Sequence, residues 1–191
     1  MNLELANKLL EQALALARNI KHLEAEAVCE LALGEAAFEN GDQPRAQVRF
    51  TRSLAVCEGA GDKRGHATAT WWLGRLDLQR GHLDRAQTRL QEALRAFHAF
   101  EMHIEMLSCL EDHADLAGQR GAVSLGVRLA AATSAMRTRL GLARSPRAEQ
   151  RWNLRKETLT KALADTDNVS LWAEGSEWDL EGAMSSAMAA Y

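Results

Sequence analysis

The chain has 191 residues, of which 47% are hydrophobic and 26% are charged, and its formal net charge at pH 7 is -3. This length fits one ordinary domain, and the composition is that of a globular protein rather than a disordered segment. The charge gives no overall attraction to nucleic acid or to an anionic membrane, and no run reaches the roughly 18 apolar residues of a membrane-spanning helix.

Apolar residues recur at steps of three or four along the whole chain, which predicts an all-α protein. The predicted helices cover 2–18, 23–40, 43–59, 63–80, 83–100, 103–120, 122–140 and 146–164, with shorter ones at 168–174 and 179–189. Asp42 before Pro44 and Ser145 before Pro146 are typical of helix starts, because a side-chain oxygen caps the first turn and proline fits there.

The first residues, MNLELANKLLEQ, lack the basic start and continuous apolar stretch of a secretory signal, so we expect a cytoplasmic protein. The three cysteines, Cys29, Cys57 and Cys109, are odd in number and widely spaced. We therefore expect them to be small buried residues rather than partners in disulfides or zinc ligands.

The chain matches itself at a shift of 40 residues. Glycine aligns with glycine at 41, 81 and 121, and the other matched positions are Leu33 with Leu73, Gly34 with Gly74, Ala46 with Ala86, Phe50 with Leu90, and Leu54 with Leu94. Each unit holds two helices, and each of these glycines stands where a helix ends and the backbone takes a positive φ. Because a helical pair cannot bury its apolar stripe alone, we expect stacked pairs in a right-handed α-solenoid of about three and a half repeats.

Leucine-glycine at 33–34 and 73–74, alanine at 46 and 86, and a large apolar residue at 50 and 90 resemble the tetratricopeptide (TPR) repeat. The 40-residue period and the link ALARNIKHLEAEA resemble the longer TPR-like solenoid of bacterial LuxR-type and STAND ATPase regulators. The chain lacks the phosphate loop and the helix-turn-helix domain of those regulators, and we expect either the C-terminal half of a larger regulator or a stand-alone descendant. The resemblance implies a non-catalytic scaffold for protein-protein interaction, serving as the sensor or interaction module of a signalling or transcriptional regulator.

In TPR-like proteins ligands lie in a concave groove lined by the first helix of each repeat. The positions that match this groove and are predicted to bind a protein or peptide are Glu35, Glu39, Thr68, Trp71, Arg75, Gln79, Glu111 and Asp115. Independently of the resemblance, the spacing from Thr68 to Gln79 puts four of them on one helix face, with Trp72 facing the core. The alternatives are a small-molecule effector in the same groove, a solvated face, or a groove filled by the chain's own tail.

The six histidines form neither an HxxxH nor an HExxH pattern, and no serine or cysteine lies in a nucleophile turn. We therefore expect no metal, no cofactor and no enzymatic activity.

The repeats are predicted to span 1–144, and 145–191 is predicted to be a helical cap of the same domain. From 137 to 161 there are eight basic residues against two acidic ones, and six acidic residues follow. This distribution favours neutralisation within the cap over a nucleic-acid patch. We expect Trp172 and Trp178 to anchor the cap on the last repeat.

The first helix carries an apolar stripe and has no partner helix before it. Its leucines are Leu3, Leu9, Leu10, Leu14 and Leu16. An exposed stripe of this kind predicts a homodimer through the N-terminal helix edge, or missing upstream sequence.

Overall fold

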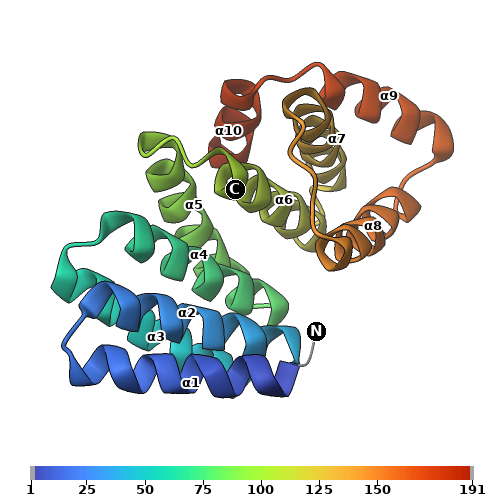
Figure 1. Ribbon diagram of the computed structural model, residues 1–191. Helices are drawn as coiled ribbons and strands as arrows, with labels where there is room; N and C mark the ends of the chain where they lie inside the picture. Colours follow the sequence, from blue (N-terminus) through green and yellow to red (C-terminus); the bar gives the residue numbers. More distant parts are fainter. Residues whose placement is uncertain (1–2, 190–191) are drawn as a thin grey trace. The chain divides into compact units, whose positions relative to one another are not determined.

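The computed structural model describes residues 3–189, which contain ten helices and no β-strand (Figure 1). The helices are α1 (Leu3–Asn19), α2 (Leu23–Glu39), α3 (Gln43–Ala60), α4 (Lys63–Gln79), α5 (Leu83–Ala99), α6 (His103–Gln119), α7 (Val123–Leu140), α8 (Pro146–Lys161), α9 (Asp165–Ser176) and α10 (Leu180–Ala189). The all-α prediction is confirmed, and every helix boundary predicted within this range lies within three residues of the observed one. The predicted first helical residue, 2, lies outside the described residues.

Residues with a left-handed backbone conformation follow the helix ends at regular intervals along the chain. Positive φ angles occur at Gly41, Gly61, Gly81, Gly121 and Gly141, and also at Lys21 and Glu101, so these residues follow one another at intervals of 20. At the first of these glycines φ is 75°, and the next amide, Asp42 N, donates back to Ala37 O at 2.9 Å. A residue without a Cβ adopts this helix-ending turn without strain, as the sequence predicts for Gly41.

The predicted helix starts carry their caps. Asp42 Oδ1 accepts a hydrogen bond from Arg45 N at 3.1 Å, and Ser145 Oγ accepts one from Ala148 N at 3.3 Å. Pro44 and Pro146 lie in the first turns of α3 and α8, where a missing N–H costs nothing. Capping and proline together fix where these two helices begin.

The chain forms two compact units, 1–100 and 101–191. In the first unit α2 packs against α1 and α3, and α4 packs against α3 and α5 (Figure 1). Its core contains the fully buried side chains of Leu33, Phe50, Leu76, Leu90 and Phe97. A Cβ at Gly34 would lie 2.6 Å from the Phe50 ring, so a glycine is needed for α2 to approach α3 this closely.

In the second unit α7 packs against α6 and α9, and α8 and α10 make smaller contacts with α6 and α7. The C-terminal segment is held by Trp152, Leu159 and Leu171, which are buried, and by Gly175, which lies directly against the backbone of Arg128 on α7. Trp172 and Trp178, which the sequence predicts to anchor this segment, are partly buried. The segment after residue 145 therefore packs on the α6–α7 pair, with Trp152, Leu159 and Leu171 among its buried side chains.

Several large apolar side chains of α1 are exposed. Leu5, Leu9 and Leu16 of α1 and Ile20 directly after it all face solvent, whereas Leu14 is buried in a small cluster with Cys29 and Leu33. Of the predicted apolar stripe, Leu9 and Leu16 are exposed, whereas Leu14 is buried and Leu10 is partly buried against it, and the side chain of Leu3 lies outside the described ones. Self-association through the exposed part remains a prediction. In the part of the chain that the structure describes, no helix combines the length and apolarity needed to cross a membrane.

Candidate functional site

Arg75 of α4 lies among aromatic rings in the first unit. Its guanidinium carbon is 4.2 Å from the ring centroid of Trp72, 5.0 Å from that of Trp71 and 5.3 Å from that of Phe38 on α2. Arg75 and Trp71 are each only 9% exposed. A cation held over several ring faces in a poorly hydrated site is stabilised by the negative potential of those faces. Both residues, which the sequence predicts to contact a partner, are therefore largely occupied by packing within their own unit.

Glu35 of α2 belongs to the same cluster. Burial raises the pKa of its carboxyl group, and the neighbouring charge of Glu39 acts in the same direction. The charge of Arg75 and a hydrogen bond from the Trp72 side chain lower this pKa but do not cancel the effect of burial. The cluster thus holds a partly desolvated carboxyl and a guanidinium between α2 and α4.

The other residues predicted in this unit lie at the ends of the cluster. Glu39 and Gln79 are exposed, and Gln43 Nε2 donates a long hydrogen bond of 3.5 Å to Gln79 Oε1. Thr68 is partly buried, and its hydroxyl donates to the backbone oxygen of Arg64 at 3.1 Å. On the predicted binding face, the central residues Trp71 and Arg75 are therefore buried, whereas the residues at its ends are exposed or partly exposed.

The first unit also contains a pocket of about 660 Å³ between the α3–α4 turn and the end of α5. Its floor is mainly apolar, with Ala67, Ala96, Ala99 and Phe100, and its polar lining includes His66. Burial raises the pKa of the Cys57 thiol beside it. The pocket has the volume and apolar lining of a site for a small molecule or an apolar side chain.

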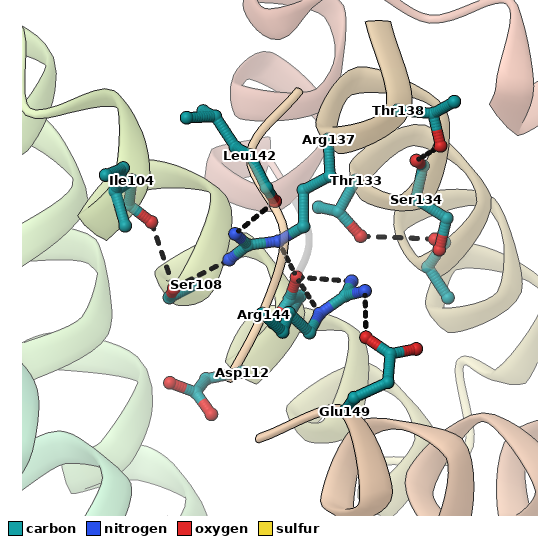
Figure 2. Close-up of polar contacts among 12 residues, drawn as sticks. Ile104, Ser108, Asp112, Thr133, Ser134, Arg137, Thr138, Leu142, Arg144 and Glu149 are labelled. Carbon is teal, nitrogen blue, oxygen red and sulfur yellow. Dashed lines mark hydrogen bonds and ion pairs between the residues drawn. The ribbon is translucent and has the colours of Figure 1, made fainter. Parts of the chain in front are cut away.

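Two arginines of the second unit converge on one carboxylate. Glu111 Oε1 on α6 accepts from Arg137 Nε at 2.7 Å and from Arg144 Nη2 at 2.6 Å. Figure 2 shows the guanidinium of Arg137 extending toward Ser108 and Leu142 and that of Arg144 extending toward Glu149. The Arg137, Arg144 and Glu111 side chains are 7%, 9% and 10% exposed, so this group is well shielded from water.

The local backbone explains how these arginines meet. Arg137 lies in the last turn of α7, and Arg144 lies in the short segment between the left-handed Gly141 and the N-cap Ser145. Leu142 N donates to Arg137 O at 3.0 Å, which folds this segment back toward α7. The guanidinium of Arg144 lies over the Trp152 ring, 4.7 Å from its centroid, and is held by this ring and by Glu111.

A pocket of about 580 Å³ opens beside these groups. Its charged lining consists of Arg137, Arg144, Lys156 and Glu149, and its aromatic lining consists of Trp152 and Trp172. Lys156 Nζ lies 5.7 Å from the centroid of the Trp172 ring. Within the described part of the second unit, this pocket combines aromatic surface with positively charged donors.

Three arginines of the basic segment from 137 to 161 pair with acids of α6. Arg155 Nη1 lies 2.8 Å from Asp112 Oδ1, and Arg155 Nε lies 3.8 Å from Asp115 Oδ2. Together with the pairs of Glu111, these contacts join Arg137 of α7, Arg144 of the following segment and Arg155 of α8 to acids of α6, of which Glu111 and Asp112 are buried and Asp115 is partly buried. The tail acid Glu174 pairs at 2.7 Å with Arg128, which lies outside the basic segment.

Of the eight predicted binding residues, six lie in the first unit and two, Glu111 and Asp115, lie in the second. The geometry places Glu111 beneath a pocket, but as the anchor of two arginines rather than as an open contact. Sequence reasoning did not identify Arg137, Arg144, Trp152 and Trp172 as one site. The run of basic residues was the available signal, because it contains both arginines.

Within residues 3–189, no group of three or more histidine, cysteine, aspartate or glutamate side chains is arranged to hold a metal ion. No protein-family model, curated protein or solved structure matches the chain.

Proposed function

We propose that this chain is a non-catalytic helical scaffold that binds a segment of a partner protein or a peptide. The observation that carries the proposal is the pocket of about 580 Å³ in the second unit, where two shielded arginines adjoin two tryptophans. Arginine and tryptophan are the residue types that most often dominate the binding energy of protein interfaces. The pocket carries the proposal instead of the face of Trp71 and Arg75, because both of those side chains are largely buried.

The arginines of the pocket are already held in position. Arg137 donates to Glu111 at 2.7 Å, to Ser108 Oγ at 2.8 Å and to Leu142 O at 3.4 Å. Arg144 donates to both Glu111 and Glu149 and is stacked on Trp152. A ligand that contacts these groups would not have to order two long side chains, and this saving in entropy favours binding.

The resemblance to TPR-like repeats extends this proposal to the architecture. We propose that the helical pairs form a right-handed solenoid with a 40-residue period and that the chain acts as the sensor or interaction module of a bacterial signalling or transcriptional regulator. Helix ends spaced by 20 residues support a repeated pair of helices. A cytoplasmic location accompanies this role.

Selection from a displayed random-peptide library against the immobilised chain tests the proposal. We expect enriched peptides to bind the native chain and to lose binding when Trp172→Ala removes the aromatic wall of the pocket. Trp178→Ala is the matched control, because Trp178 is also partly buried in the second unit but does not line the pocket. Peptides that bind the Trp172→Ala and Trp178→Ala variants equally well would contradict the proposal.

A second candidate function is the sensing of a small effector molecule. Both pockets, of about 660 Å³ and about 580 Å³, have volumes typical of small-molecule sites. A thermal-shift screen of metabolite mixtures tests this, since a ligand present at 100 times its Kd stabilises the fold by about 2.7 kcal/mol. A compound that stabilises the native chain but not the Trp172→Ala variant would place the effector in the second pocket.

A further inference from the structure

We infer that the pocket of the second unit recognises a carboxylate group and that Glu149 occupies the carboxylate position until a ligand displaces it. The inference rests on the proposed function and adds the chemical class of the ligand. Shared carboxylate chemistry could come from an acidic side chain or from the C-terminus of a peptide.

The charges around the pocket are unequal. Arg137, Arg144 and Lys156 contribute three positive charges, while Glu111 and Glu149 contribute two negative ones. Both arginines share a single oxygen, Oε1, of the Glu111 carboxylate. The site therefore keeps an excess of positive charge, and this excess doubles when Glu149 turns away. A shielded excess of positive charge favours an anionic ligand.

Glu149 is held far less firmly than Glu111. Its side chain is 46% exposed, against 10% for Glu111, and it makes one contact, 3.1 Å from Glu149 Oε2 to Arg144 Nη1. Because the Glu149 side chain is nearly half exposed, water can solvate its carboxylate when it turns away from Arg144, and Arg144 keeps its ion pair with Glu111. Rotation of Glu149 into solvent therefore costs little and leaves an N–H group of Arg144 directed into the pocket.

The remaining lining suits a group attached to that carboxylate. Trp172 offers a ring face, and Lys156 lies above this ring, with its Nζ 5.7 Å from the centroid. Figure 2 shows that Glu149 meets Arg144 on the side away from Arg137. A ligand carboxylate bound to Arg144 would therefore lie beside Trp172 and Lys156, while Glu111 holds the other side of the Arg144 guanidinium. Guanidinium groups bind carboxylates through strong charge-assisted hydrogen bonds.

Three short peptides test the inference, with binding followed by the intrinsic tryptophan fluorescence of the full chain. The probes are Ac-Ala-Leu-Ala with a free C-terminus, the same peptide as its amide, and Ac-Ala-Glu-Ala amide. We expect at least one carboxylate-bearing probe to bind about tenfold more tightly than the neutral amide, since its charge-assisted bonds are lost in the amide. Binding of one or both acids identifies which source of carboxylate the pocket accepts.

Variants connect this binding to the residues. Glu149→Gln removes the competing carboxylate, so it should tighten the binding of the acidic probe by about threefold or more. Arg144→Gln should weaken that binding about tenfold. Arg147→Gln is the matched control, because Arg147 is an exposed arginine near the start of the same helix and does not line the pocket. Circular dichroism checks that each variant is folded. If Arg144→Gln does not fold, the binding of the acidic probe to Glu149→Gln tests the inference.

The inference is overturned if acid and amide bind equally, if Glu149→Gln binds no more tightly than the native chain, or if no probe binds to either protein. Its failure can be separated from failure of the proposed function. Peptides that bind without regard to charge and are lost with Trp172→Ala would leave the scaffold function intact. Library peptides that ignore Trp172→Ala would contradict both.

Discussion

The guanidinium carbon of Arg75 lies 4.2 Å from the ring centroid of Trp72 on the same helix. This contact turns a residue type associated with surfaces into a part of the core between α2 and α4. Because the guanidinium of Arg75 also lies over the ring of Phe38 on α2, Arg75 connects α4 to α2. The stability of the first unit should therefore depend on it.

Replacing Arg75 with alanine should destabilise the protein by at least about 2 kcal/mol, because a desolvated cation over aromatic rings contributes about that much. Urea denaturation followed by circular dichroism measures the change. Arg64→Ala is the matched control: Arg64 is exposed and lies over a single ring, 5.7 Å from the Phe100 centroid. Its loss should cost about 1 kcal/mol or less. Equal stability of the two variants would show that the Arg75 cluster is not a structural element.

Glu35→Gln should change the dependence of stability on pH. Burial raises the pKa of the Glu35 carboxyl in the folded state above its ordinary value of 4.5. The folded protein then binds this proton more tightly than the unfolded chain, so the contribution of Glu35 to stability is greatest below pH 4.5 and falls as the pH rises through the raised pKa. The glutamine variant has no such loss, and its unfolding free energy relative to the native chain should rise between pH 4 and pH 7.

Denaturation at a series of pH values measures this difference. Glu24→Gln serves as the control, because Glu24 is an exposed carboxyl on the same helix. Its difference from the native chain should not rise in this way. A flat difference for Glu35→Gln would mean that the pKa of Glu35 is the same in the folded protein and in the unfolded chain, and would contradict the prediction.

Gly175→Ala should be strongly destabilising. A Cβ at this position would lie 2.3 Å from the backbone oxygen of Arg128, so α9 would have to move away from α7. Overpacking of this kind costs about 1–3 kcal/mol or more. Gly59→Ala is the counterpart, since nothing lies within 4 Å of a Cβ there and the residue is in α3. That change should stabilise the protein by up to about 1 kcal/mol. Stability of Gly175→Ala equal to that of the native chain would contradict the packing of α9.

Local sequence signals predicted the helices well. Glycine with positive φ and proline after a capping residue act within a few residues, which is why Gly41 and Pro44 could be interpreted from the sequence alone. Trp72 was likewise predicted to be in the core and is buried. Lys21 and Glu101 also take positive φ, although neither residue type indicates it.

The candidate site was harder to predict because it depends on contacts between distant residues. Helical spacing showed that Trp71 and Arg75 share a face, but it carried no information that Phe38 of α2 would cover that face. Glu111 meets Arg137 and Arg144, which are 26 and 33 residues away along the chain. Charge composition revealed the basic segment without showing which acids it would pair with.

Nuclear magnetic resonance of the tryptophan indole N–H groups tests the proposed binding site most directly. The chain has five tryptophans, and their signals can be assigned by single substitutions. On addition of a library-selected peptide, the account predicts that the Trp172 and Trp152 signals shift while those of Trp71, Trp72 and Trp178 change little. Shifts confined to Trp71 and Trp72 would contradict it and would assign peptide binding to the α2–α4 face.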